Sequence, residues 1–286
     1  MEIYETISSI RRAISTARSE HQSICLVPTM GNLHEGHLSL VRQARNLADQ
    51  VVASLFVNPL QFGVNEDLDS YPRTFQDDCE KLTAEGVHHL FAPAADEMYP
   101  DSEQATSKQT EVVVPGLSEI LCGESRPTHF TGVTTVVSLL FNIIQPDSAV
   151  FGKKDFQQLA IIRKMVRDLR IPVEIFGCPI VREKDNLAMS SRNNYLTPAE
   201  RKVAPVLNQI VRKAAEDILS GNSDYVEVCD TAINELARAG FTPDYFTVRN
   251  AATLEIARPE DTDLVILTAA WLGKPRLLDN FEVKLK

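Results

Sequence analysis

Cysteine is scarce in this sequence, and none of it stands in paired spacing. The five cysteines are spread along the chain without a CxxC pair: Cys25, Cys79, Cys122, Cys178 and Cys229. Zinc sites and disulfide frameworks need closely spaced or regularly paired cysteines. The pattern therefore argues against both and predicts buried, reduced thiols.

The sequence also lacks an excess of positive charge. Its formal net charge is −10 at pH 7, so the phosphate neutralisation that drives nucleic-acid binding would need a local basic patch. The richest basic stretches, within residues 163–167 and 201–202, lie in segments with helical periodicity, where charges usually form the solvated face. We therefore expect no nucleic-acid partner.

A long hydrophobic run is missing as well. The most apolar segment, residues 133–144, is interrupted by Thr134, Thr135, Ser138 and Asn142, and a membrane-spanning helix needs about 20 mostly apolar residues. Residues 1–18 carry charges throughout and contain no apolar stretch of the kind found in signal peptides. We expect no membrane association and a cytoplasmic protein.

The composition that remains is typical of a globular protein. The 286 residues are 44% hydrophobic and 24% charged, and they include no biased tract and no internal repeat. Single hydrophobic cores stop growing near this length, which favours two domains over one.

Short runs of β-branched residues alternate with helical segments through the first two-thirds of the chain. The predicted strands are residues 23–27, 51–57, 88–91, 149–151 and 173–176. Apolar residues recur at helical spacing between the first two strands, and again between the last two, where Pro172 ends the helix. These units predict a Rossmann-like, doubly wound α/β fold, whose ligands bind beyond the carboxyl ends of the strands.

The character of the sequence changes near Arg182. A polar stretch at residues 183–194 precedes two helical segments, about 198–219 and 225–239, and strand-like segments follow at 245–248 and 264–272. We therefore predict a Rossmann-like domain at residues 1–182 and a smaller α+β C-terminal lid domain at residues 183–286.

The most informative segment follows the first predicted strand and opens the first helix. Residues 28–37 read PTMGNLHEGH and contain the pattern HxGH. His34 and His37 share one face of a helix N-terminus, where N–H groups and the helix dipole favour an anion. Gly36 lets a flat base or ribose approach the backbone closely. The segment predicts a nucleotide-phosphate site whose imidazoles stabilise the charge of departing pyrophosphate.

Two other interpretations of this segment stay open. A histidine at a helix start can simply cap the helix beside a chance neighbour, since short motifs have real false-positive rates. A metal site would need a third and a fourth ligand, and no cysteine or carboxylate stands at ligand spacing.

Two further segments carry groups suited to phosphates. Residues 151–158 end a strand and enter a helix, so Lys153 or Lys154 could reach the α-phosphate and stabilise an in-line displacement. A solvated lysine pair is the alternative, although cations are unfavourable at a helix start. Residues 189–192 offer two hydroxyls and a guanidinium to the β- and γ-phosphates, or only a serine cap for the next helix.

Five segments together resemble the pantothenate synthetase family. They are residues 27–37, 56–63, 69–74, 151–158 and 189–192, in that family's order and approximate spacing. The similarity extends over nearly the whole chain and is strongest from residue 26 to residue 192. It implies a Rossmann-type domain of the HIGH-motif nucleotidyltransferase superfamily, a C-terminal lid, a homodimer, ATP with Mg²⁺, and the substrates (R)-pantoate and β-alanine.

The resemblance also assigns roles to single residues. His37 would be the catalytic proton donor with His34 beside it on the phosphates, and Lys154 would act at the α-phosphate. Gln61 and Gln158 would hold pantoate through their amides.

The remaining residues carried over by position complete the site. The ATP site would comprise these histidines with Met30, Gly31, Asn32, Leu33, Glu35, Gly36, Gly152, Lys153, Lys154, Asp155, Val181, Met189, Ser190, Ser191 and Arg192. An apolar wall around the gem-dimethyl group of pantoate would comprise Phe56, Tyr71, Val136 and Val137, and Asp77 and Asp78 would contact Mg²⁺ indirectly. The family often has an acidic residue where this chain has Lys153, and members can place an amide where it has Lys81.

The motifs favour one function over three alternatives. We expect an ATP-dependent ligase that joins (R)-pantoate to β-alanine through a pantoyl-adenylate and releases AMP and pyrophosphate. An adenylyltransferase acting on another small acid or phosphate substrate shares the HxGH pattern, but neither it nor a nucleotide sensor needs the two glutamines. The acidic chain, without an anticodon-binding region, argues against a tRNA synthetase.

Overall fold

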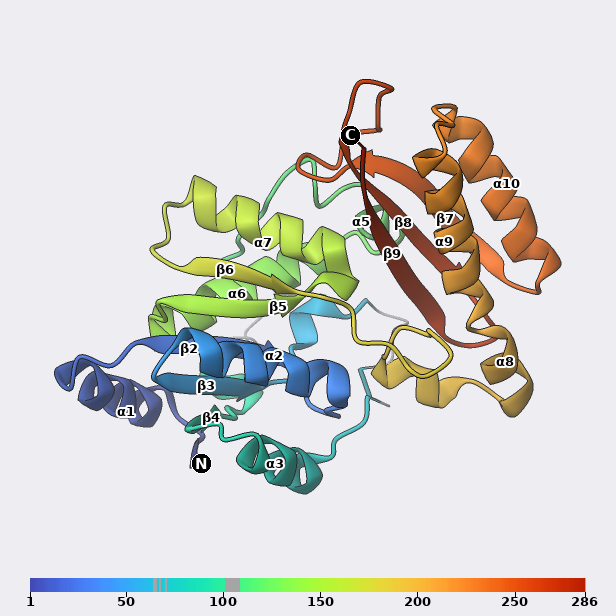
Figure 1. The fold of residues 1–286 in the computed structure, drawn as a ribbon. Coiled ribbons are helices and arrows are strands. Elements are labelled where there is room, and N and C mark those ends of the chain that lie inside the picture. Colours follow the sequence, from blue (N-terminus) through green and yellow to red (C-terminus); the bar gives the residue numbers. More distant parts are fainter. Residues whose placement is uncertain (64–65, 67, 70, 101–108, 286) are drawn as a thin grey trace. The chain divides into compact units, whose positions relative to one another are not determined.

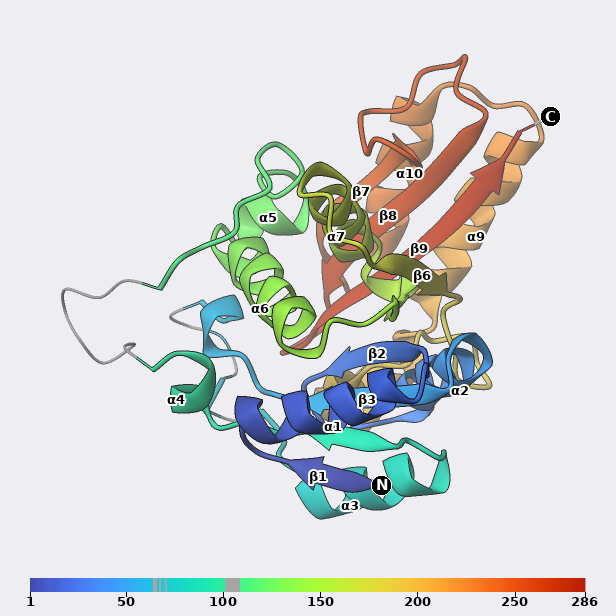
Figure 2. The same cartoon turned by 90° about the vertical axis from the view of Figure 1, so that its left-hand side faces the viewer.

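The computed structural model describes residues 1–63, 66, 68–69, 71–100 and 109–285. They form two compact units (Figures 1 and 2). The N-terminal unit comprises Met1–Lys153 and Ile161–Pro179, and the C-terminal unit comprises Lys154–Ala160 and Ile180–Lys286. The domain boundary placed after residue 182 on sequence grounds stays a prediction.

A parallel sheet forms the centre of the N-terminal unit. Among the described residues its strand order is β1-β4-β3-β2-β5-β6, and every pairing is parallel. The strands are β1 Glu2–Tyr4, β2 Ile24–Thr29, β3 Gln50–Leu55, β4 His89–Phe91, β5 Ser148–Gly152 and β6 Glu174–Cys178. From β2 the chain moves outward through β3 and β4, and it later returns to β5 on the other side. The strand order therefore reverses between β2 and β5, where ligands of doubly wound proteins bind.

Helices cover both faces of this sheet. The helices are α1 Ile7–Ser19, α2 Glu35–Leu47, α3 Phe75–Ala84, α4 Ala95–Met98, α5 Cys122–Ser125, α6 His129–Ile144 and α7 Phe156–Asp168. Figure 2 shows α2 on one face and α6 on the other. The side chains of β2 alternate between these faces, and Ile24, Cys25, Leu26 and Val27 are all fully buried. Such continuous burial is expected of a parallel strand covered on both sides, and the predicted doubly wound α/β fold is confirmed.

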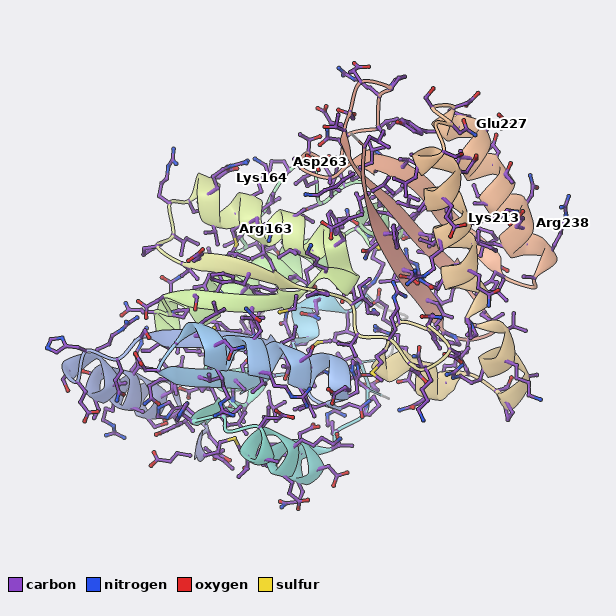
Figure 3. All side chains as sticks on the ribbon, in the orientation of Figure 1. Arg163, Lys164, Lys213, Glu227, Arg238 and Asp263 are labelled. Atoms are coloured by element: carbon purple, nitrogen blue, oxygen red, sulfur yellow. The ribbon has the colours of Figure 1, made fainter. Side chains whose placement is uncertain are left out.

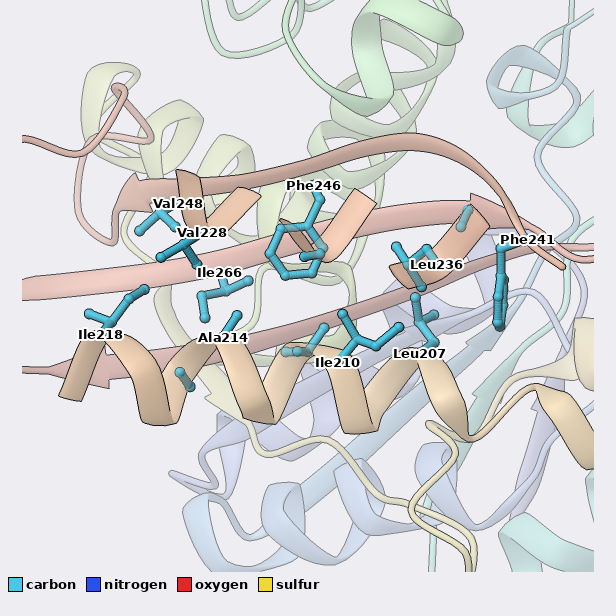
Figure 4. Packing of buried hydrophobic residues seen from close by; sticks show 14 of the residues in the cluster. Leu207, Ile210, Ala214, Ile218, Val228, Leu236, Phe241, Phe246, Val248 and Ile266 are labelled. Carbon is cyan, nitrogen blue, oxygen red and sulfur yellow. The ribbon is translucent and has the colours of Figure 1, made fainter. Parts of the chain in front are cut away.

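The C-terminal unit packs helices on an antiparallel sheet. In order along the described chain, its elements are η3 Ser191–Tyr195, α8 Pro198–Val203, α9 Val206–Leu219, α10 Tyr225–Arg238, β7 Thr242–Asn250, β8 Asp263–Trp271 and β9 Arg276–Lys284. Figure 4 shows the core between α9 and the sheet, with Leu207, Ile210, Ala214 and Ile218 facing Phe246 and Ile266. The predicted smaller α+β region is confirmed.

Several elements differ from the sequence-based expectation. The helix expected over residues 198–219 is two helices, α8 and α9, because Pro205 lacks the N–H that a continuous helix would need. The strands β1 and β9 and the helices α1, α3 and α6 were not predicted. In α6, apolar residues surround the helix and most are buried, so the stripe that normally reveals a helix is missing.

The basic residues of α7 lie on its outer face, as expected for charges in a helical segment. Arg163 and Lys164 extend outward from α7 (Figure 3), and Lys164 pairs with Asp168 one turn later.

All five cysteines are free; Cys229 is partly exposed, and the others are buried. Burial raises the pKa of Cys25 to about 11, which keeps this thiol protonated and unreactive. No helix of the described ranges is long and apolar enough to cross a membrane.

Candidate active site

The HxGH motif lies in the connection between β2 and α2. β2 ends at Thr29, and His34 is the N-cap residue of α2. Between them Gly31 and Asn32 adopt left-handed backbone conformations, with φ of 87° and 50°. Glycine takes this conformation without a steric penalty, and asparagine tolerates it better than most residues. The loop therefore connects the carboxyl end of β2, where the strand order reverses, to the N-terminus of α2, which His34 caps.

The two imidazoles of the motif lie beside one another. Their ring centroids are 4.1 Å apart. Nδ1 of His34 accepts a hydrogen bond from the N–H of Gly36 at 3.1 Å, and Nδ1 of His37 accepts one from the N–H of His34 at 3.3 Å. A neutral imidazole whose Nδ1 accepts a hydrogen bond carries its proton on Nε2. Both rings are therefore assigned the Nε2–H tautomer.

This tautomer reconciles two interpretations of the motif. His34 does cap α2, as the simpler interpretation holds. Capping uses Nδ1, however, whereas a phosphate oxygen would be bound by Nε2–H, so one imidazole can serve both purposes. The backbone hydrogen bonds also fix the rotation of each ring, which is the preorganisation that electrostatic stabilisation of a transition state requires.

Gln61 lies next to the HxGH loop. It ends the short helix η1 (Pro59–Gln61) after β3, and its buried side chain donates from Nε2 to the sulfur of Met30 at 2.9 Å. Asn58 donates from Nδ2 to Oε1 of Gln61 at 3.2 Å and to the carbonyl of Gly132 at 3.0 Å. The structure thus brings the predicted substrate amide to the predicted nucleotide loop.

Asn58, which contacts the predicted site residue Gln61, was not singled out from the sequence. It is almost fully buried, its Oδ1 accepts from the hydroxyl of Tyr99 at 2.8 Å, and it caps η1 through the N–H of Leu60. Burial raises the pKa of Tyr99, so the phenol stays a hydrogen-bond donor. The Asn-Pro pair at residues 58–59 was the available signal, because this pair commonly starts a turn.

The four residues of the predicted apolar wall are all buried. Phe56 directly follows β3, Val136 and Val137 lie on α6, and Tyr71 packs edge-on against Phe62 with ring centroids 5.8 Å apart. α6 approaches η1 so closely that a Cβ on Gly132 would lie 2.3 Å from the carbonyl oxygen of Leu60. The wall on α6 and the turn that carries Gln61 therefore belong to one packed surface.

Two acidic residues of the predicted site bind other groups of the same chain. The carboxylate of Glu35 pairs with Arg42, and the hydrogen bond from Arg42 lowers the pKa of Glu35. The carboxylate of Asp78 accepts from the backbone N–H groups of Asn32 and Leu33 at 2.8 and 2.7 Å. Both oxygens of Asp78 are therefore used within the protein.

The described residues do not form a metal-binding cage. No group of three or more His, Cys, Asp and Glu side chains in the described ranges could hold a metal ion. Asp77 lies exposed in the first turn of α3, and the neighbouring Asp78 is held by the HxGH loop. A resident metal does not fit this arrangement, and the indirect magnesium contacts of the two residues stay a prediction.

The predicted lysine segment begins at the carboxyl end of β5. Gly152 ends this strand, which pairs with β2, and Lys153–Asp155 forms the short helix η2 before α7. Within the C-terminal unit, Nζ of Lys154 lies 3.7 Å from Oδ1 of Asp155. The carbonyl oxygen of Lys154 accepts from Nδ2 of Asn280 on β9 at 2.9 Å. Gln158 follows in the first turn of α7 and is half-buried.

The remaining ATP-site candidates lie on a turn of the C-terminal unit. The N–H of Met189 donates to the carbonyl of Val181 at 3.0 Å. Ser190 is the N-cap of η3 and accepts from the N–H of Arg192 at 3.3 Å, while Ser191 opens that helix. The simpler interpretation of the serine pair, a helix cap, therefore holds for Ser190. The phosphate role of residues 189–192 stays a prediction.

Fold and loop together define a class of protein. A doubly wound parallel sheet carries an HxGH helix start at the reversal of its strand order, which makes this chain a Rossmann-like α/β protein with a site suited to nucleotide phosphates.

The chain belongs to the pantoate–β-alanine ligase family, because the model of that family, described as "Pantoate-beta-alanine ligase", matches residues 2–282. It is 55% identical over 279 residues to a pantothenate synthetase of Hahella chejuensis, covering 98% of each chain. It is 54% identical over 286 residues to one of Pseudomonas putida strain GB-1, covering 100% of this chain and 99% of the relative. The family is one of ligases, so the adenylyltransferase alternative is not favoured.

Solved structures agree with this assignment. A crystal structure of pantothenate synthetase from Thermus thermophilus is similar with a TM-score of 0.92 and 42% identity, covering 100% of both chains. A pantoate–β-alanine ligase from Francisella tularensis, whose structure is titled as complexed with "Beta-gamma ATP and Beta-alanine", is similar with a TM-score of 0.81 and 32% identity, covering 98% of this chain and 97% of that one.

Proposed function

We propose that this protein condenses (R)-pantoate with β-alanine at the expense of ATP. In the first half-reaction a carboxylate oxygen of pantoate attacks the α-phosphorus, the bond to the bridging oxygen breaks, and pyrophosphate leaves. In the second, the amine of β-alanine attacks the acyl carbon, AMP leaves, and the attacking nitrogen loses a proton. The products are pantothenate, AMP and pyrophosphate.

One observation carries this proposal beyond family membership. Both imidazoles of the HxGH motif are held by backbone N–H groups at Nδ1, so each presents its proton on Nε2 at the N-terminus of α2. Charge develops on the pyrophosphate as it departs, and a fixed donor at that position stabilises it. We assign this role to His34 and His37, which as neutral rings donate hydrogen bonds from Nε2–H; His37 acts as the proton donor in its protonated form.

The other roles follow the same chemistry. Lys154 faces the α-phosphate and neutralises charge in the in-line displacement, and the segment from Met189 to Arg192 holds the β,γ unit. Gln61 and Gln158 hold pantoate through their amides, while Phe56, Tyr71, Val136 and Val137 surround its gem-dimethyl group. The position of Gln61 against Met30 of the nucleotide loop supports attack of one substrate on the other.

Several further features belong to the proposal. ATP binds with Mg²⁺, which proteins commonly take up through substrate phosphates and retained waters and not through a dedicated cage. The Francisella structure, complexed with "Beta-gamma ATP and Beta-alanine", supports ATP and β-alanine as substrates of this protein. We also propose a cytoplasmic homodimer whose residues 183–286 act as a lid domain.

An isotope experiment tests the reaction. The protein is incubated with ATP, β-alanine and pantoate that carries ¹⁸O in its carboxylate. We expect AMP formation that depends on pantoate, and one labelled oxygen in the AMP. Label in inorganic phosphate, or ADP as the nucleotide product, would refute the adenylate route, and AMP formation without pantoate would refute the substrate.

A further inference from the structure

A buried carboxylate on α3 holds the loop that precedes the catalytic histidines. Asp78 has 1% of its surface exposed. Its two oxygens accept from the N–H groups of Asn32 and Leu33, at 2.8 and 2.7 Å, and from the hydroxyl of Thr74 at 3.0 Å. A carboxylate that accepts two consecutive backbone N–H groups fixes the orientation of the peptide between them.

Lys81 holds the next peptide of the same loop. It lies one turn after Asp78 on α3, and its Nζ donates to the carbonyl oxygen of Leu33 at 2.8 Å. Asp78 and Lys81 therefore bind the N–H and the C=O of one residue, Leu33. The residue that follows is His34, whose own N–H is bonded to Nδ1 of His37.

The loop needs this support because its backbone is strained. Gly31 and Asn32 have φ of 87° and 50°, and a left-handed conformation at a residue other than glycine persists only where its surroundings determine it. The contact is also close, since a Cβ on Gly31 would lie 3.1 Å from Oδ2 of Asp78. The carboxylate packs directly against the turn that it bonds.

We propose that Asp78 and Lys81 are positioning residues for the two histidines of the HxGH motif, and that Asp78 acts on this loop instead of on the magnesium ion. The proposal rests on the function proposed above. A rotation of the Leu33–His34 peptide would move both imidazoles together, because His34 and His37 are bonded to each other through the backbone of His34. A shift of about 1 Å at such a site can cost about a hundredfold in rate.

The test compares three substitutions on α3. Asp78→Asn replaces one of the two acceptor oxygens by an N–H donor, and Lys81→Met removes the ammonium while keeping an unbranched apolar stem of similar length. Glu80→Gln is the matched control, because Glu80 is exposed and bonds only to Gln76 on the same helix among the contacts described for it. Each variant is measured in both half-reactions, with adenylation followed as single-turnover pyrophosphate release and aminolysis followed on preformed pantoyl-adenylate.

We expect a selective loss in the first half-reaction. Adenylation should fall about a hundredfold in Asp78→Asn and about tenfold in Lys81→Met, while aminolysis stays near the wild-type rate because pyrophosphate has already left. Glu80→Gln should match the wild type in both. The concentration of Mg²⁺ that gives half-maximal adenylation should be the same in all four proteins.

Three results would overturn the proposal. Recovery of Asp78→Asn by raised Mg²⁺ would place this carboxylate on the metal. An equal loss in both half-reactions would indicate a general structural defect, and unchanged adenylation in Lys81→Met would remove Lys81 from any positioning role even if Asp78→Asn failed to fold. Failure of the wild type to form AMP from ATP and pantoate would instead refute the underlying function.

Discussion

Substitution of Gly132 by alanine should damage pantoate binding by moving a neighbouring turn. Gly132 lies on α6, and an added Cβ would stand 2.3 Å from the carbonyl oxygen of Leu60 and 2.6 Å from the backbone nitrogen of Gln61, where ordinary contact begins at 3.4 Å. The turn would have to retreat by about 1 Å, and overpacking of this kind costs about 1–3 kcal/mol. The same change should disturb the bond from Asn58 to the carbonyl of Gly132, which is 3.0 Å long.

Helix propensity acts in the opposite direction. Alanine stabilises a helix interior by about 1 kcal/mol relative to glycine, so we expect the net loss in the free energy of unfolding to lie between about 0 and about 2 kcal/mol. Because Gln61 moves with the turn, the KM for pantoate should rise about tenfold or more, as expected for loss of one hydrogen bond to a charged or hydroxyl group. The KM for ATP should change much less.

Urea unfolding and steady-state kinetics measure the two effects. Asn142→Ala is the matched control, because Asn142 is exposed on the same helix and its side chain bonds only to the carbonyl of Ser138 among the described contacts. A Gly132→Ala protein that is more stable than the wild type and has an unchanged KM for pantoate would show that helix propensity alone decides the outcome. A steric clash between the added Cβ and the turn at Leu60 would then be refuted.

Three further predictions address the site and the fold. His37→Ala and Lys154→Ala should each lower the single-turnover rate of adenylation about a hundredfold with little change in the melting temperature; near wild-type rates would remove both from the mechanism. Gln61→Ala should raise the KM for pantoate about tenfold or more and that for ATP little, and equal losses for both substrates would point to a general defect. Burial alone would raise the pKa of Asp147, but hydrogen bonds from Arg18 and from the first N–H of β2 lower it. The ionised carboxylate therefore stabilises the folded protein above the unfolded pKa of about 3.9, and this stabilisation is lost as the pH falls through the folded pKa. Asp147→Asn should therefore reduce the free energy of unfolding most at neutral pH and progressively less as the pH falls below about 4, and a reduction of the same size at every pH, measured with urea, would contradict this.

The sequence by itself determined the class of fold and the HxGH segment of the candidate site. The alternation of β-branched runs with helical stripes depends on local periodicity, which is visible without tertiary contacts. The same holds for HxGH, since both histidines lie within one turn of each other and the helix start that orients them is encoded in the same segment. The chemistry of the segment could therefore be inferred from adjacent residues.

Elements without a local signal were missed. α6 is apolar around its circumference because it is covered on most sides, and this removes the polar face by which a helix is recognised. β9 carries charged residues, yet Asp279 within it is buried and bonded to Arg182 and Asn208, which lie 97 and 71 residues earlier in the chain. A buried carboxylate of this kind is stabilised by a network of partners that are far apart along the chain, and no local sequence pattern indicates such a network.

Only the tertiary structure decided which residues support the site. Asp78 is 45 residues from Leu33 along the chain, and from sequence its neighbour Asp77 looked equally suited to magnesium. Burial and two backbone hydrogen bonds distinguish them, because an acceptor enclosed by N–H donors is committed to those donors. Asn58, Gly132 and Gln61 likewise meet through contacts between α6 and η1 with its N-cap residue Asn58. Such contacts depend on how the helices pack on the sheet, and packing is set by the whole core and not by any one segment.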